Sequence, residues 1–400
     1  MQNKIIIWLA ACCLAVTGCM SMQDPYEKGL HTLTVQGVYP EGYQASAQAT
    51  VTIENISSGV TYRIEEVSGG AVSTRLQSGI YRVMMHDQLG AHVFNGLQDR
   101  VVVESEDVSL SLPLTHSQTG TIVIKELYCG GCPKDPEEGT YQSDQYLILH
   151  NNDPLVQYLD GLCLATLSPY NSNAANHWRD AQGNLPEFLP LVQAVWKVGG
   201  TGNSFPLQPG EDAVICLRGA IDHTAQYPLS VNLNKPGYFV CYNPVYFANP
   251  IYHPAPGDQI REDHYLEVVI KTGKANAYTV SVNSPALVIF RPEGMDIHSY
   301  VLLPSSIRQE PGASDQMVVI PPDWVMDGLE VFNGASSDNH KRLPANVDAG
   351  YVSLIQTFKC RTLMRRTSEE ESAARGYEVL QDTNNSSEDF YERQVQSLHN

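Results

Sequence analysis

The chain has 400 residues, of which 42% are hydrophobic and 17% charged, so it is long enough for two or three domains and too apolar to be disordered throughout. It carries 44 acidic residues against 25 lysines and arginines, a formal net charge of −19. Such a surface repels phosphate backbones, which argues against a nucleic-acid-binding protein. The 30 glycines, 24 prolines and 21 tyrosines favour strands and turns.

The first 18 residues have the pattern of an export signal. Lys4 precedes an apolar run from Ile5 to Val16, which is too short to span a bilayer as a helix. The following Val16-Thr17-Gly18-Cys19 resembles a bacterial lipobox, in which the cysteine is acylated and becomes the mature N-terminus. We therefore predict a lipoprotein signal peptide over residues 1–18 with Cys19 as the lipidation site. An ordinary signal peptide cut elsewhere is the alternative.

Residues 19–29 form the predicted lipid-anchored tether. Several acyl chains on one cysteine hold a protein firmly on a membrane, so we predict a body that is held to a membrane by its lipid. From the lipoprotein resemblance, the predicted location is the outer membrane. Some lipoproteins of the Bacteroides type carry acidic residues directly after the lipidated cysteine, and these direct the protein to the cell surface. Asp24 and Glu27 stand in this place. They favour the cell surface over the periplasmic face.

Residues 30–116 are predicted to form a first β-sandwich. Val108, Leu110, Leu112 and Leu114 alternate with polar residues, as in a strand with one buried and one solvated face. A turn and the sequence SGIYRV (residues 78–83) precede a core strand. This resembles the transthyretin-like or carboxypeptidase-regulatory-like sandwich, with an immunoglobulin-like sandwich as the alternative. Residues 116–120 are polar and are predicted to be the linker.

Residues 117–400 are predicted to form a second β-sandwich with long loops. Four segments carry the pattern, in the order KELY (125–128), HNN (150–152), LDGLCL (159–164) and LQPGEDAVI (207–215). They resemble the lamin-tail-type sandwich, although the acidic residue usual in its second strand is missing from 146–151. The whole chain, with its terminal LQDTNNSSEDF (380–390), resembles an uncharacterised family of Bacteroides-type lipoproteins. The fold class predicted is therefore all-β.

Two long loops of the second domain are the predicted recognition surface, because proline- and aromatic-rich loops on a β-scaffold commonly bind ligands. They cover residues 165–206 and 242–263. The aromatic residues predicted to contact a ligand are Trp178, Trp196, Tyr246, Phe247 and Tyr252. The alternative is that these rings cap an irregular core. Residues 369–376 are predicted to be a charged, flexible insertion.

Six cysteines remain outside the signal peptide and the lipidation site. Cys129 and Cys132 form a CxxC motif that follows a predicted strand and precedes prolines. A redox-active motif would instead begin a helix, so a local disulfide between Cys129 and Cys132 is predicted, with unpaired thiols as the alternative. Connectivity among the others is open.

One loop concentrates imidazole and carboxylate side chains that suit a divalent metal ion. These are His253, Asp258, Glu262, Asp263 and His264. No HExxH-type spacing fixes two of them on one helix face, so a solvated acidic loop is the alternative. Residues 382–388 alternate oxygen-bearing side chains as in a calcium loop, but the central glycine is missing and turn or cap roles are predicted.

The sequence has no nucleophile elbow, Walker loop or complete dinucleotide-binding motif. We therefore predict a non-catalytic, lipid-anchored binding or accessory protein without a cofactor. By analogy with its family type, the predicted partner is an outer-membrane assembly such as a TonB-dependent receptor. The alternatives are a secreted metal- or carboxylate-dependent hydrolase and a structural spacer or adhesin.

Overall fold

The computed structural model of the protein describes residues 29–334 and 336–399. The predicted signal peptide, Cys19 and the tether up to residue 28 lie outside these residues. Strands dominate the described chain, and the predicted all-β class is confirmed. Its α-helices are α1 (Ile297–Tyr300), α2 (Glu369–Arg375) and α3 (Ser386–Asp389), with 3-10 turns at His223–Ala225, Glu262–His264, Pro304–Ser306, Pro322–Trp324 and Ser336–Asp338. No helix in the described ranges is long and apolar enough to cross a membrane.

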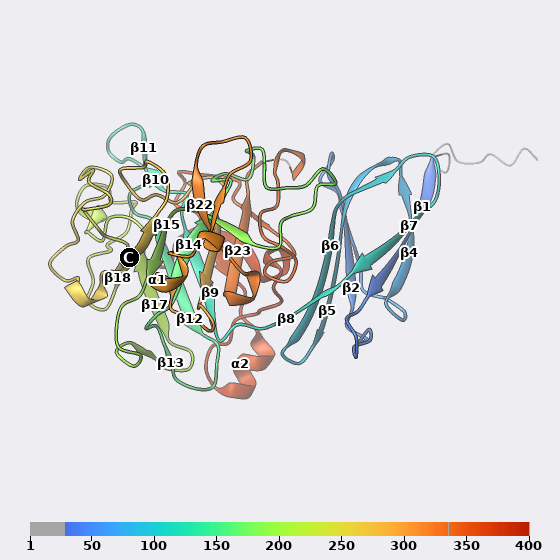
Figure 1. The fold of residues 1–400 in the computed structure, drawn as a ribbon, viewed down its shortest axis with the longest axis horizontal. Coiled ribbons are helices and arrows are strands. Elements are labelled where there is room, and N and C mark those ends of the chain that lie inside the picture. The colour runs from blue at the N-terminus through green and yellow to red at the C-terminus, as the bar shows by residue number, and fades with distance from the viewer. Residues whose placement is uncertain (1–28, 335, 400) are drawn as a thin grey trace, which may run out of the picture.

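The first eight strands form a sandwich of two sheets (Figure 1). The small sheet has the order β4 (Ala71–Gln77), β1 (Leu30–Val38), β7 (Val108–Pro113). The larger sheet has the order β3 (Thr61–Ile64), β2 (Thr50–Asn55), β5 (Gly79–Leu89), β6 (His92–Val103), β8 (Thr115–Gln118). Inward side chains from both sheets, such as Val35, Ile53 and Phe94, pack into one core. In β7 the residues alternate between more buried and exposed positions, as the alternation of apolar and polar residues in the sequence predicted.

Strand β8 corrects the predicted linker. Residues 115–118 pair with β6 in antiparallel register, with His116 opposite Phe94. His116 also stacks on Tyr43, and its ring lies 5.0 Å from that of His92. Polar side chains are expected on a strand at the edge of a sheet, which is why composition alone suggested a linker here. The connection between the two sandwiches is therefore shorter than predicted and begins after Gln118.

The second domain is also a pair of sheets packed face to face. One has six strands: β18 (Phe239–Val240), β17 (Asp212–Cys216), β12 (Tyr146–Asn151), β9 (Ile122–Tyr128), β25 (Thr362–Arg365), β26 (Phe390–Arg393). The other runs β21 (Ile307–Gln309), β22 (Gln316–Ile320), β15 (Leu189–Lys197), β14 (Cys163–Leu167), β20 (Ala286–Phe290), β23 (Val325–Phe332), β24 (Val352–Ser353), with β19 (Glu267–Lys271) also on β15. Two short ladders pair β10 (Cys132–Pro133) with β11 (Thr140–Tyr141) and β13 (Gln157–Tyr158) with β16 (Pro206–Leu207).

Both large sheets are covered on both faces. The core between them contains Leu147, Trp196 and Leu329, while a second core lies under α1 and a third under residues 220–260. Strands β12 and β14 are consequently buried along their whole length. Strand β15 lies inside the predicted loop 165–206 and corrects it. Pro190 suggested a loop, yet its neighbours pair with both β14 and β22.

The two sandwiches meet along the larger sheet of the first (Figure 1), and polar contacts between side chains hold the junction. Arg82 on β5 is 2% exposed and pairs with Glu54 and Asp99 of its own sheet. Asp99 also pairs with Arg179 of the second domain at 2.7 Å, and Glu54 accepts a hydrogen bond from the hydroxyl of Tyr351 at 2.7 Å. The junction is thus a network of buried charges in which each sandwich supplies partners for the other.

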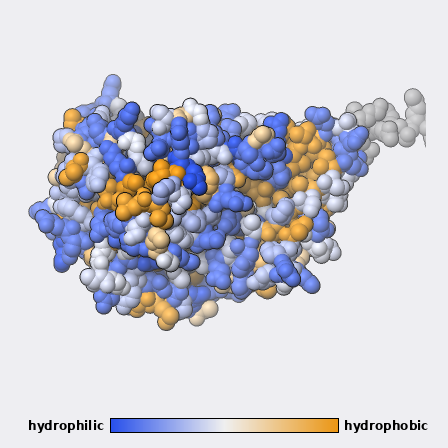
Figure 2. Space-filling view, in the orientation of Figure 1, coloured by the Kyte–Doolittle hydropathy of each residue, from blue (hydrophilic) through white to orange (hydrophobic). Residues whose placement is uncertain are grey.

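Figure 2 shows a mostly hydrophilic face with a hydrophobic patch over the part of the second domain around α1. Exposed apolar side chains beside this helix include Met295, Leu302 and Leu303. A second exposed group, Val245 and Ile251, lies in the predicted recognition loop 242–263. Single exposed apolar side chains are usual on soluble proteins, so their exposure alone indicates no partner.

Candidate functional site

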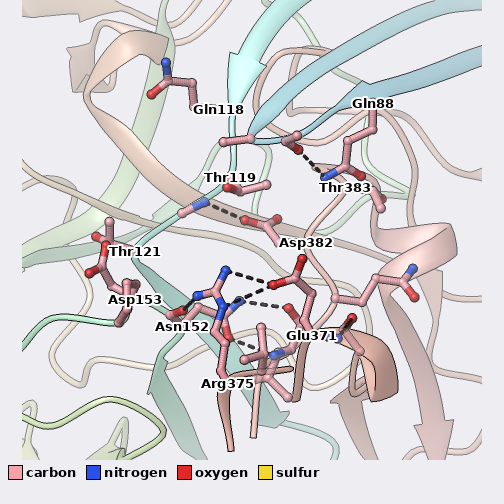
Figure 3. A pocket seen from close by; sticks show the side chains of 18 residues that line it. Gln88, Gln118, Thr119, Thr121, Asn152, Asp153, Glu371, Arg375, Asp382 and Thr383 are labelled. Carbon is pink, nitrogen blue, oxygen red and sulfur yellow. Dashed lines mark hydrogen bonds and ion pairs between the residues drawn. The ribbon is translucent and has the colours of Figure 1, made fainter. Parts of the chain in front are cut away.

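A pocket of about 560 Å³ lies where the two sandwiches join (Figure 3). Four segments from distant parts of the sequence line it. They are the turn between β5 and β6 with Gln88, residues 118–121 at the end of β8 and in the connection, residues 152–154 after β12, and residues 368–383 from α2 onward. Its volume is in the range of small-ligand sites, and its position between domains is a common one for such sites.

Helix α2 forms one wall of this pocket. The side chain of Ser368 caps its first turn by accepting from the N–H of Glu371, and Gly376 ends it in the left-handed conformation with φ +78°. Arg375 pairs with Glu371 at 2.9 Å and donates a 2.8 Å hydrogen bond to the carbonyl of Asn152 (Figure 3). The flexible insertion predicted for residues 369–376 is therefore wrong, because caps and Arg375 hold this segment in place.

Asp382 forms the inner wall of the pocket. One of its oxygens accepts a 2.6 Å hydrogen bond from the N–H of Gly120, as Figure 3 shows, and the other lies 3.3 Å from the guanidinium of Arg365. Asp382 therefore ties the C-terminal segment to the connection between the sandwiches. The turn role predicted for residues 382–388 agrees with these contacts, and the calcium-loop alternative does not.

Arg365 lies behind Asp382 and is 1% exposed. Its guanidinium also contacts Asp327 and Asp389, so three carboxyl groups surround one cation. Burial raises the pKa of Asp327 and Asp389 by removing water from their carboxyl groups. The nearby charge of Asp382 raises both further, and Arg365 opposes the shift. This cluster fixes the shape of the pocket, and only Asp382 lines it.

Three side chains at the end of β8 and in the connection are available to a ligand. Among the residues that the structure describes, the side chains of Gln118, Thr119 and Thr121 line the pocket and make no hydrogen bond with the rest of the chain. A primary amide and two hydroxyl groups offer both donors and acceptors. The chemistry of this wall suits an uncharged ligand rich in hydrogen-bonding groups.

A second pocket of about 460 Å³ lies on the other side of the same connection. It shares residues 118–121 with the first pocket and adds Arg291, Asp323 and Asn346. The connection therefore runs between two hollows, with Asp382 holding it from one side through Gly120.

The five aromatic residues predicted to contact a ligand are separated by the structure. Trp196 and Phe247 are at most 1% exposed and pack together in the core between the sheets, with their ring centroids 5.7 Å apart. Trp178 is also buried, and its indole N–H donates to Ser168 at 3.2 Å. For these three the structure argues against the predicted ligand contact, since packing leaves each of them at most 8% exposed. Tyr246 and Tyr252 are 43% and 49% exposed and do not line the pocket.

The residues predicted to bind a metal ion are not gathered into a site. His253 is 3% exposed, stacks on Tyr242 and accepts a hydrogen bond from the N–H of Asn243 at 3.0 Å. Burial and the nearby Arg218 lower its pKa to about 4. His264 instead stacks on Phe239, with the ring centroids 4.5 Å apart.

The carboxylates of the same loop have other partners. Asp258 accepts a hydrogen bond from Asn234 at 2.9 Å, Asp263 pairs with Arg261, and Glu262 is exposed at the start of a 3-10 turn. Within residues 29–334 and 336–399, no group of three or more His, Cys, Asp or Glu side chains is placed to hold a metal ion. The arrangement fits the solvated acidic loop that the sequence also allowed.

The CxxC motif does not bring its own two thiols together. Both cysteines are free in the structure. Cys129 points into the core between the two large sheets, whereas Cys132 contacts Cys360. The predicted pairing of Cys129 with Cys132 is therefore not the contact that the fold makes.

Sequence reasoning missed the pocket because most of the residues that line it are polar and lie outside any recognisable motif. Residues 118–121 were assigned in part to a linker, residues 369–376 to a flexible insertion and residues 382–388 to turns. The signals that were present are the cap at Ser368, the glycine at 376 and the acidic Asp382 in the terminal motif. They mark ordered structure, but the sequence carries no information that these segments meet.

Residues 208–397 match the family model described as "Protein of unknown function (DUF4876)". The chain is also similar to the crystal structure of a DUF4876 family protein from Bacteroides thetaiotaomicron VPI-5482, with 26% sequence identity and a TM-score of 0.58. This similarity covers 91% of the chain and 95% of that protein. A comparison with curated proteins gives no match. Together these results support the predicted resemblance to an uncharacterised Bacteroides-type family.

Proposed function

We propose that this protein is a non-catalytic binding protein whose ligand occupies the pocket between the two sandwiches. The observation that carries the proposal is the wall formed by Gln118, Thr119 and Thr121, which line the pocket and whose side chains make no hydrogen bond within the described chain. The ligand we expect is uncharged and polar, such as a neutral oligosaccharide or a peptide backbone. Its hydroxyl or amide groups would replace water on this wall.

The charged groups of the pocket support binding rather than catalysis. Glu371 is paired with Arg375, and Asp382 is held by Arg365 and by the N–H of Gly120. A carboxyl group that acts as a general acid or base must reach the substrate and exchange its proton there. Here these two carboxylates already serve to hold the walls, and the third carboxylate of the lining, Asp153, accepts a 2.8 Å hydrogen bond from the N–H of Leu155. A carboxylate-dependent hydrolase is therefore the less favoured function for this pocket, and a spacer or adhesin would leave its free hydrogen-bonding wall unexplained.

We further propose that Cys19 anchors the protein to the outer membrane, at the cell surface rather than the periplasmic face. The lipobox-like Val16-Thr17-Gly18-Cys19 and the acidic Asp24 and Glu27 support this location. An outer-membrane receptor of the TonB-dependent type is the partner we propose. We also propose that the first sandwich is a transthyretin-like module and that the second is a lamin-tail-like domain.

The experiment is a thermal-shift screen of the purified protein against neutral oligosaccharides and short peptides, followed by calorimetric titration of the compounds that stabilise it. Thr121→Trp places a bulky ring in the pocket, and we expect it to weaken binding at least about tenfold. Ser314→Trp, on the exposed turn between β21 and β22, is the matched control and should bind like the wild type.

Two results would contradict the proposal. Equal affinity of the Thr121→Trp variant and the wild type would place the ligand elsewhere. Turnover of any oligosaccharide or peptide by the wild type, abolished in Asp382→Asn, would show that the pocket is an active site and favour the hydrolase.

A further inference from the structure

Two cysteines that are far apart in sequence meet beside β10. Cys132 begins this strand, and Cys360 lies just before β25. Backbone hydrogen bonds hold the two segments together, from the N–H of Phe358 to Gly130 at 2.9 Å and from the N–H of Cys360 to Gly131 at 3.1 Å. Gly131 has φ +73°, and a Cβ there would lie 2.1 Å from the carbonyl oxygen of Tyr141. The backbone on both sides of the pair is therefore fixed.

The thiol groups of Cys132 and Cys360 lie next to each other and interact electrostatically. Each thiol has one further partner. Cys132 donates to the buried carboxyl of Asp144 at 3.5 Å, and Cys360 donates to the carbonyl of Leu229 at 3.5 Å. We propose that Cys132 and Cys360 form a disulfide when the protein meets a disulfide oxidant, and that this bond ties β10 to the segment before β25.

The two cysteines have unequal roles in this reaction. Cys132 is fully buried, whereas Cys360 is partly exposed and can be reached by an oxidant. The neighbouring Cys132 thiol lowers the pKa of Cys360, whereas the Cys360 thiol, burial and Asp144 raise the pKa of Cys132. Cys360 is therefore the thiol that reacts first, as its thiolate.

Oxidation proceeds by two exchange steps. The Cys360 thiolate attacks one sulfur of an oxidant such as glutathione disulfide, which releases one glutathione thiolate and leaves a mixed disulfide on Cys360. The Cys132 sulfur then attacks Cys360, its proton passes to the carboxylate of Asp144 and on to water, and the second glutathione leaves. The two thiols lose two electrons and two protons in total, and the oxidant is reduced to two glutathione thiols.

The other four described cysteines are less suited to this reaction. Cys129 and Cys241 point into the core between the large sheets, and Cys163 and Cys216 lie in the two outer cores. All four are at most 1% exposed, and burial raises the pKa of each thiol. The proposal does not depend on the ligand pocket, which none of the six cysteines lines.

The test is oxidation of the purified, fully reduced protein by glutathione disulfide at pH 8, followed by alkylation of the remaining thiols and tryptic digestion without reduction. Trypsin releases Glu126–Lys134, which contains Cys129 and Cys132, and the dipeptide Cys360–Arg361. We expect these two peptides to be linked in most of the product. The link should persist in Cys129→Ala and disappear in Cys132→Ala.

A second measurement follows the midpoint of thermal unfolding. In the oxidised wild type and Cys129→Ala, reduction should lower this midpoint by several degrees, and in Cys132→Ala it should have no effect. Complete alkylation of Cys132 after oxidation, an internal Cys129–Cys132 link, or persistence of the link in Cys132→Ala would each overturn the proposal.

Discussion

Replacing Arg82 with methionine tests whether buried charges hold the two sandwiches together. The Arg82 guanidinium lies 2.6 Å from Asp99 and 2.9 Å from Glu54, and the rings of Phe332 and Tyr351 from the second domain lie 5.4 and 5.2 Å from it. Methionine keeps most of the apolar stem but removes the charge. The variant therefore isolates the electrostatic part of the junction.

The expected loss follows from what each carboxylate retains. Removing one partner of a buried ion pair commonly costs about 3–5 kcal/mol, because the other charge stays buried. Here Asp99 keeps Arg179, and Glu54 keeps the hydroxyl of Tyr351. We therefore expect the lower end, about 3 kcal/mol, including the lost contacts between the cation and the two rings.

Urea unfolding at pH 7 measures this loss with two signals. Trp178, Trp196 and Trp324 all lie in the second domain, so their fluorescence reports that domain, whereas circular dichroism reports both. The two transitions should coincide in the wild type and separate in Arg82→Met. Arg63→Gln is the control, since its pair with Glu388 crosses the same junction but is partly exposed, and it should cost less than about 1 kcal/mol. A loss below about 1 kcal/mol in Arg82→Met, with coincident transitions, would refute the reasoning.

Two further predictions concern the anchor and a buried carboxylate. Cys19→Ala should move the protein from the membrane to the soluble fraction of disrupted cells, and its continued sedimentation with membranes would contradict lipidation at this residue. Asp160 is 6% exposed and, although burial opposes its ionisation, hydrogen bonds from the N–H groups of Ser204, Phe205 and Gly202, each at 2.9 Å, lower its pKa to about 2. A lowered pKa stabilises the fold above the ordinary value of 3.8, and this contribution is lost as the pH falls from about 4 towards 2. After allowance for solvent screening, Asp160→Asn should be about 1–2 kcal/mol less stable than the wild type at pH 7, with a smaller difference at pH 3 by urea unfolding. An equal difference at both pH values would show that ionisation of Asp160 does not contribute.

The all-β class was predictable because strands that bury one face leave a pattern of period two. Leu112 and Leu114 are buried, whereas their neighbours Ser111 and Pro113 are exposed. In the second domain the same signal fails, because both faces of β12 and β14 are covered and their sequences are simply apolar. Strand β15 was not predicted, because Pro190 suggested a loop although the residues around it are apolar.

The candidate site was not predictable, because tertiary contacts create it. Trp196 and Tyr246 both occur in proline-rich segments, yet one is in the core and the other is exposed. Sequence composition treats them alike. The pairing of Asp382 with Gly120 brings together residues from opposite ends of the second domain, and no local pattern encodes such a contact.

The order of strands along the chain has a consequence for how the protein is made. All strands of the first sandwich lie within residues 30–118, so this unit can complete its sheets early in synthesis. Strand β9 follows at once, but the neighbour it takes on one side is β25, at residues 362–365. Until the ribosome reaches that segment, this edge of β9 stays without a partner and open to pairing with other chains. A chain that terminates early would therefore keep a finished first sandwich, lack the wall formed by residues 368–383, and be prone to aggregate through β9.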